Sequence, residues 1–260
     1  MELVDTHAHL TYSPLWEDLE SVLARSRQAG VTRWITVGTS PEENRRAAAC
    51  AERTEGLWAA VGYHPHHADE ISSEDLELLR RTAVHPRVAA IGETGLDYHY
   101  LHSSADNQRR IFRAQLELAA ELNKPVIVHI RQAFPEAMAI LDSYQSRLSR
   151  VVIHCYSGSP TETEEVLRRG YFVSFTGIVT FKKADLLRQS ARMMPPERVM
   201  IETDCPYLSP EPVRHVQPNE PALLVHTAAK LAELYGMPME EFARKMTANS
   251  IAFFGLAQRV

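Results

Sequence analysis

The sequence predicts a parallel (β/α)8 barrel, and three observations lead to this fold class. Eight short apolar runs alternate with stretches of helical patterning, and the runs are continuous, as expected of strands buried on both faces. The chain has no glycine-rich first turn, which disfavours a doubly wound open sheet as the alternative. Most runs end in a histidine or a carboxylate, and functional groups lie at the C-terminal ends of the strands in this fold.

The expected strands coincide with the apolar runs at 3–9, 34–38, 57–61, 88–92, 126–130, 151–155, 171–175 and 199–203. Ser40 followed by Pro41 and two acidic residues is a typical helix start, and Gly30 is a typical helix end. The expected helices include 15–29, 73–84, 106–122, 136–148, 162–169, 221–234 and 239–253.

Length and composition favour one domain covering residues 1–260. This length fits one large barrel or two modest domains, and no Pro/Gly/Ser-rich linker, low-complexity tract or composition shift divides the chain. A formal charge of −5 excludes a strongly basic nucleic-acid-binding surface, but a nucleic-acid enzyme remains possible because bound metal ions add positive charge. We therefore keep nucleic acid among the candidate substrates.

Cysteine usage and hydropathy predict a cytoplasmic protein. The three cysteines have no CxxC spacing and are odd in number, which is typical of a reducing compartment. No apolar run is long enough to cross a bilayer, and the first residues lead into a strand without a signal-peptide pattern.

An H-x-H pair ends the first expected strand. Side chains two apart in a strand point to the same face, so His7 and His9 can bind one cation together. A chain with 12 histidines can contain such a pair by chance. The other strand ends argue against chance, because they add further metal-ligand types from five more strands: His64, Glu93, His129, His154 and Asp204. The sequence therefore predicts a metal site at the C-terminal ends of the strands.

Seven motifs occur in order along the whole chain: DTHAHL at 5–10, VGYHP at 61–65, IGETGLDY at 91–98, KPVIVHIR at 124–131, HCYSG at 154–158, GIVTFKK at 177–183 and IETDCPYL at 201–208. Together they resemble the TatD family of metal-dependent deoxyribonucleases, within the amidohydrolase-like barrels. The resemblance implies two divalent metal ions per chain. It places His7, His9, Glu93 and Asp204 on one ion and Glu93, His129 and His154 on the other, with Glu93 bridging.

The chemistry of phosphodiester cleavage agrees with such a site. It needs a hydroxide nucleophile, neutralised phosphoryl oxygens and help for the leaving oxygen, all of which two cations can supply. Mixed imidazole and carboxylate ligands suit Zn²⁺, Mn²⁺ or similar ions better than Mg²⁺, although Mg²⁺ in the cell stays possible. Asp204 is the candidate general base, and Glu93 is the second candidate catalytic residue.

Three residues are candidate substrate contacts, each with a structural alternative. His64 either contacts phosphate or packs at a strand end, and Arg131 either binds phosphate or forms a surface ion pair. Glu202 either joins the site or pairs with a neighbouring cation. Asp97 is expected to order the loop after the fourth strand. Four histidines near loop tips contact substrate or take adventitious metal, with adventitious metal favoured: His66, His67, His99 and His102.

The favoured function is a metal-dependent deoxyribonuclease, a hydrolase of ester bonds that acts on the ends of DNA or on single strands. The alternative is another barrel hydrolase acting on an ester or amide, such as an aminoacyl-tRNA deacylase or a deaminase. Many of those enzymes bridge their metals with a carboxylated lysine, and Glu93 at that position favours the nuclease. A non-catalytic metal-dependent binding protein is disfavoured because the ligand set looks complete. We expect no membrane association and no obligate protein partner.

Overall fold

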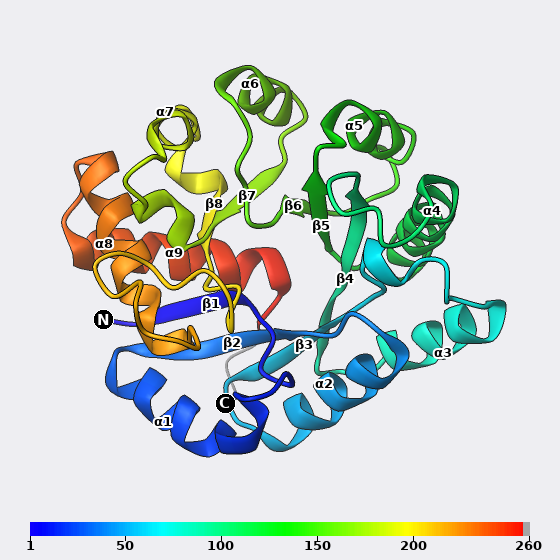
Figure 1. Ribbon diagram of the computed structural model, residues 1–260, viewed down its shortest axis with the longest axis horizontal. Coiled ribbons are helices and arrows are strands. Elements are labelled where there is room, and N and C mark those ends of the chain that lie inside the picture. The colour runs from blue at the N-terminus through cyan, green and yellow to red at the C-terminus, as the bar shows by residue number, and fades with distance from the viewer. Residues whose placement is uncertain (257–260) are drawn as a thin grey trace. The chain divides into compact units, whose positions relative to one another are not determined.

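The computed structural model describes residues 1–256, and it confirms the predicted (β/α)8 class. Parallel strands alternate with helices, and the strand order in the sheet follows the chain from β1 to β8 (Figure 1). The strands are β1 (Leu3–Ala8), β2 (Val31–Val37), β3 (Leu57–Val61), β4 (Val88–Asp97), β5 (Val126–Arg131), β6 (Val151–Ile153), β7 (Phe172–Phe175) and β8 (Val199–Ile201).

The helices that follow the strands are α1 (Leu19–Gln28), α2 (Pro41–Arg53), α3 (Ser73–Ala83), α4 (Ala105–Leu122), α5 (Phe134–Asp142), α6 (Pro160–Arg168), α7 (Asp185–Met193), α8 (Leu224–Tyr235) and α9 (Met239–Phe254). Five of the predicted helices, α3, α4, α6, α8 and α9, begin and end within three residues of the predicted positions, and α1 begins four residues later than predicted. Ser40 caps α2 as predicted, because its side chain accepts a hydrogen bond from the Glu43 backbone N–H. No bounds were predicted for α7, the helix between β7 and β8, and α5 ends six residues earlier than expected.

Contacts gather the chain into two compact units. We call residues 1–35 together with the chain from 155 onward the terminal unit, and residues 36–154 the central unit. The prediction that residues 1–260 make one domain stays a prediction.

In the terminal unit, the ends of β1 and β8 are joined by backbone hydrogen bonds. The Asp204 N–H donates to the His7 carbonyl at 2.9 Å, and the His9 N–H donates to the Cys205 carbonyl at 2.8 Å. Helix α9, red in Figure 1, packs on both strands. These bonds fix the H-x-H pair of β1 beside the segment that follows β8.

The buried carboxylate of Asp5 reinforces this junction. It accepts hydrogen bonds from the Thr203 N–H at 2.9 Å, the Thr203 hydroxyl at 2.5 Å and the His7 N–H at 3.3 Å. Burial raises the pKa of Asp5 to about 7, although the hydrogen bonds oppose that rise. One side chain thus ties together the chain segments that carry His7 and Asp204.

In the central unit, strand β4 is five residues longer than predicted, and Glu93 lies within it. Its register with β5 shifts between Ile91 and Thr94, and Gly95 pairs with His129. Gly92 and Gly95, with φ of +143° and +141°, leave no room for a side chain. A Cβ on Gly92 would lie 2.6 Å from the Ile127 carbonyl oxygen, and one on Gly95 would collide with the His129 carbonyl oxygen. The G-E-T-G sequence therefore lets β4 approach β5 closely on either side of Glu93.

Polar side chains from the helices bind the ends of the strands of the central unit. Gln115 of α4 accepts from the Tyr63 N–H at 2.7 Å and donates to the Thr94 hydroxyl at 2.6 Å. Gln108, two turns earlier, accepts from the Asp97 N–H at 2.8 Å and donates to the Asp97 carbonyl at 3.0 Å. Both amides are buried, so they satisfy backbone groups that water does not reach.

Two strands end earlier than predicted, and the chain then leaves the extended conformation. Strand β6 stops at Ile153 and β8 at Ile201, and the chain turns away two to three residues later at Cys155 and Asp204, with φ of +44° and +55°. Within residues 1–256, none of the helices combines the length and the apolar character that crossing a bilayer requires.

The close approach at Gly95 gives a stability prediction. Gly95→Ala should lower the free energy of unfolding by about 3 kcal/mol or more, because the new methyl group meets backbone that cannot rotate away. Gly170→Ala is the matched control, since Gly170 also has positive φ (+70°) but nothing lies within 4 Å of its Cβ position. Strain at φ alone should cost the control about 1–2 kcal/mol. Urea denaturation of both variants measures the difference, and equal losses would contradict the steric argument.

Candidate metal centre

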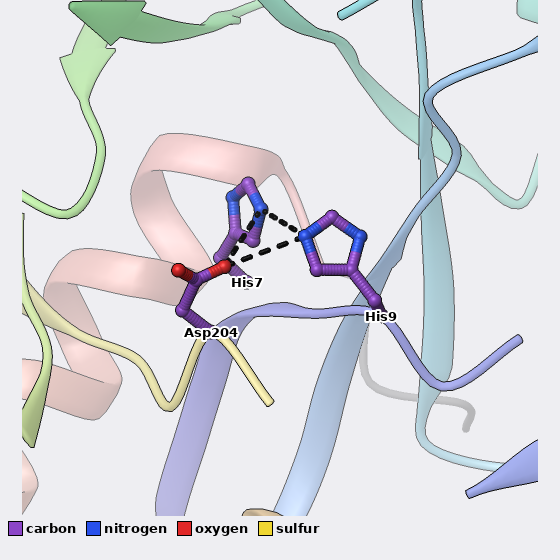
Figure 2. A group of neighbouring side chains, drawn as sticks. All are labelled: His7, His9 and Asp204. Atoms are coloured by element: carbon purple, nitrogen blue, oxygen red, sulfur yellow. Dashed lines mark hydrogen bonds and ion pairs between the residues drawn. The ribbon is translucent and has the colours of Figure 1, made fainter. Parts of the chain in front are cut away.

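The end of β1 and the segment after β8 bring three predicted ligands together in the terminal unit. His7 Nε2 and His9 Nε2 lie 3.3 Å apart, and Asp204 Oδ1 lies 3.4 Å from His9 Nε2 and 3.7 Å from His7 Nε2. Figure 2 shows both imidazoles turned toward each other and toward the carboxylate. His7 is fully buried, whereas the Asp204 side chain keeps 15% of its surface exposed. We call these three residues the terminal cluster.

A second group of ligand types surrounds Glu93 in the central unit. Its Oε1 lies 2.7 Å from His154 Nε2, 2.9 Å from His129 Nδ1 and 3.4 Å from His64 Nε2. His129 Nδ1 and His154 Nε2 are also only 3.2 Å apart. We call these four residues the central cluster: Glu93 and His129 lie within β4 and β5, and His64 and His154 follow β3 and β6.

The central cluster holds an ionised carboxylate. Burial alone would raise the pKa of Glu93, but the neighbouring His154 and the hydrogen bonds of His129 and His154 hold that pKa well below its ordinary value. Burial lowers the pKa of His64 to about 4, so this imidazole is neutral at neutral pH and offers a nitrogen lone pair. A carboxylate beside a neutral imidazole is a suitable ligand pair for a divalent cation.

Asp97 orients His129 within the central cluster. Its Oδ2 lies 3.1 Å from His129 Nε2 and 3.0 Å from His66 Nε2. Burial opposes ionisation of Asp97, but hydrogen bonds from His129 and His66 outweigh it and depress the carboxyl pKa. An ionised carboxylate only accepts hydrogen bonds, so His129 Nε2 donates its proton to Asp97. His129 Nδ1 faces the Glu93 carboxylate at 2.9 Å, where a proton or a bound cation lies between the two groups. Metal-binding histidines commonly have such a carboxylate partner.

Both clusters fit metal ions by the chemistry of their donors. The ligand atoms of His7, His9 and Asp204 all lie within 4.8 Å of one another, as do those of His64, Glu93 and His129. Nitrogen lone pairs that face each other at this distance repel unless a proton or a cation lies between them. The chain therefore has groups that can hold metal ions, and imidazole–carboxylate sets are typical of Zn²⁺ and similar ions.

Each of the six predicted ligands lies in one of the two clusters, and His64, predicted as a substrate contact, joins the central one. Of the other candidate contacts, Glu202 also belongs to a group with metal-binding geometry, which includes the ligand His7. Arg131 is exposed, with its guanidinium 4.6 Å from the centre of the Tyr100 ring. Glu202 is buried, and its carboxylate accepts from the Cys155 N–H at 2.6 Å and from the Thr6 hydroxyl at 3.4 Å. Asp97 orders its loop as predicted, since Oδ1 accepts from the His99 and Tyr100 N–H groups.

Some residues that shape the site were missed by sequence reasoning. Asp5, Gln108 and Gln115 bind backbone beside the ligands, and so does Asn44 of α2, whose amide exchanges two hydrogen bonds with Gly62. For three of them, the sequence contains a pattern that could have indicated their role. Asp5 is a carboxylate within an apolar run, and Gln108 and Gln115 are amides seven apart, on the face of α4 that carries Ile111 and Phe112.

The fold and these two clusters define a metal-dependent hydrolase of the barrel class. Residues 4–255 match the family described as TatD related DNase. The metal-dependent hydrolase YabD of Bacillus subtilis, described as uncharacterized, is 38% identical over 97% of this chain and 98% of its own length. The 3'-5' ssDNA/RNA exonuclease TatD of Pantoea vagans is 39% identical over 98% of this chain and 100% of its own. The crystal structure of YJJV, a TatD homologue from Escherichia coli, has a TM-score of 0.90 and 31% identity, covering 98% of both chains. The chain therefore belongs to the TatD-related DNase family, as its ordered motifs predicted.

The hydrogen bond from His129 to Asp97 gives a prediction for metal affinity. Asp97→Asn keeps the shape of the side chain but removes the charge that fixes the His129 proton on Nε2, so affinity for Zn²⁺ at the central cluster should fall about 10–100-fold. Asp69→Asn is the control, because Asp69 also holds loop backbone, through Ser104, but is not part of either cluster. Calorimetric titration with Zn²⁺ compares the two variants. An unchanged affinity in Asp97→Asn would contradict the role assigned to Asp97.

Proposed function

We propose that this protein is a metal-dependent exonuclease that removes nucleotides from the 3' end of single-stranded DNA or RNA. The observation that carries the proposal is the pair of clusters, each composed of imidazoles and one carboxylate and each at the C-terminal ends of barrel strands. Membership of the TatD-related DNase family and the activity printed for relatives such as the Pantoea vagans exonuclease support the choice of substrate.

The proposal includes two divalent ions per chain, one at each cluster. The terminal cluster would hold one through His7, His9 and Asp204, and the central cluster the other through Glu93, His129 and His154. Zn²⁺ or Mn²⁺ suits these ligands, and Mg²⁺ is a candidate in the cell. When bound, such ions lower the pKa of water and neutralise charge on phosphoryl oxygens.

The chain's own residues divide the remaining work. Asp204 is the proposed general base: Oδ1 faces the two imidazoles, and Oδ2 accepts the proton of the attacking water. Glu93 stays ionised among its imidazoles and keeps negative charge at the central cluster. His64 and Arg131 are the proposed contacts for substrate phosphate. Glu202 was the third candidate contact, and its hydrogen bond from Cys155 N–H supports a role in holding the segment after β6.

The direct test uses oligonucleotides labelled at one end. Single-stranded DNA, single-stranded RNA and blunt duplex DNA, each carrying a 5' label, are incubated with metal-loaded protein beside ester and amide substrates. The proposal predicts a ladder of single strands shortened from the 3' end and slower digestion of the duplex. Hydrolysis of esters or amides without cleavage of any strand would overturn it in favour of another barrel hydrolase.

Metal stoichiometry tests the assignment of ligands. The protein should bind two ions per chain, and His7→Ala and His154→Ala should each lower this number to one and abolish activity, because each removes one imidazole from one cluster. His226→Ala is the control, since His226 lies on α8 and is part of neither cluster, and it should keep two ions. Elemental analysis after gel filtration gives the count. Only trace metal in an active preparation, or two ions in both cluster variants, would contradict the assignment.

A further inference from the structure

We propose that Tyr100, His102 and Arg131 form a stacking platform for a nucleobase of the single-stranded substrate. The inference rests on the proposed nuclease function and adds to it a subsite that recognises bases. We call these three residues the Tyr100 platform.

The platform consists of flat, exposed side chains. The Tyr100 and His102 rings are almost parallel, with centroids 5.5 Å apart and 6° between their planes. The Arg131 guanidinium carbon lies 4.6 Å from the centre of the Tyr100 ring, which is the geometry of a cation–π contact. Tyr100 nevertheless keeps 49% of its surface exposed, and His102 and Arg131 are exposed as well. Aromatic surface left open beside a cation is therefore available to a further ring.

The Tyr100 platform is attached to the residue that orients a proposed metal ligand. Asp97 Oδ1 accepts from the Tyr100 N–H at 3.0 Å, while Oδ2 accepts from His129 Nε2 at 3.1 Å. His66, bound to the same Oδ2, meets the Tyr100 ring edge-on at 5.6 Å between centroids. A base on the platform and a phosphate at the central cluster would thus be held by groups that share the Asp97 carboxylate.

The geometry also bears on the loop-tip histidines, for which substrate contact and adventitious metal were the two interpretations. Within residues 1–256, the groups with metal-binding geometry do not include His66, His67, His99 or His102, which disfavours adventitious metal at these positions. Every nucleobase has a π-face, so rings such as those of Tyr100 and His102 bind bases with little dependence on sequence. The positive charge of Arg131 suits the adjoining phosphate. Such a subsite would suit an exonuclease that accepts many sequences.

The test combines variants of Tyr100 with substrates that lack one base. Oligonucleotides with a single abasic residue at successive positions from the 3' end are digested by the wild type, Tyr100→Ala and Tyr100→Phe. Tyr144→Ala is the matched control: Arg147 lies 5.6 Å from the Tyr144 ring centre, but Tyr144 follows α5 and precedes β6, at the opposite ends of the strands from the clusters.

We expect the Tyr100 ring and the base to contribute to binding only together, so that removing either one raises KM and removing both raises it no further. At one position, removal of the base should raise the wild-type KM about tenfold, and Tyr100→Ala should show the same tenfold increase on the intact substrate with no further effect of the abasic residue. Tenfold corresponds to about 1.4 kcal/mol, within the range of base–aromatic stacking. The kcat should change little, and Tyr100→Phe and Tyr144→Ala should behave as the wild type. Quenching of 2-aminopurine fluorescence at that position should weaken in Tyr100→Ala alone.

Two outcomes would overturn the inference, and they are distinguishable. If the wild type digests single strands but Tyr100→Ala responds to every abasic position as the wild type does, the platform is wrong and the exonuclease proposal stands. If the wild type digests no nucleic acid, the proposed function fails and the platform fails with it.

Discussion

The burial of the Glu93 carboxylate is the constraint on which the central unit depends. Removing a carboxylate from water costs several kcal/mol unless partners compensate, and the partners here are the imidazole nitrogens of His154, His129 and His64 at 2.7–3.4 Å. The neighbouring sequence serves that placement. Glycines on both sides let β4 approach β5, Gln115 of α4 binds the Thr94 hydroxyl next to Glu93, and Asp97 fixes the tautomer of His129. Imidazole nitrogens gathered around a carboxylate in this way are suitable ligands for a divalent cation.

In the terminal unit, backbone hydrogen bonds hold the ligand residues in place. Hydrogen bonds between the ends of β1 and β8 hold His7, His9 and Asp204 within reach of one cation, and the buried Asp5 carboxylate joins the two segments from behind. Asp5 is itself a buried acid whose pKa is raised to about 7 by desolvation. The desolvated Asp5 carboxylate fixes the positions of the proposed ligands His7 and Asp204, and buried groups with shifted pKa values are common at functional sites.

The fold class and the cluster residues could be predicted because they depend on local periodicity. His7 and His9 share a strand face through the two-residue repeat, and the remaining ligands follow apolar runs, whose C-terminal ends carry the functional groups of a parallel barrel. The length of β4 could not be predicted in the same way, because G-E-T-G lacks the apolar, β-branched character of a strand and becomes one only against β5. Asp97 was assigned to its loop but not to His129, since that contact depends on three-dimensional packing. Helix α7 was given no bounds from the sequence, although Leu187 and Ala191, four residues apart, lie on one buried helix face.

The central claim is that each cluster holds one metal ion, and anomalous X-ray scattering from crystals of the Zn²⁺-loaded protein tests it most directly. Data collected on either side of the zinc absorption edge locate the metal without reference to activity. The account predicts two peaks per chain, one contacting His7 Nε2, His9 Nε2 and Asp204 Oδ1, and one contacting Glu93 and His129 Nδ1. Peaks confined to other histidines, such as His66 or His102, or no peak at either cluster, would contradict it.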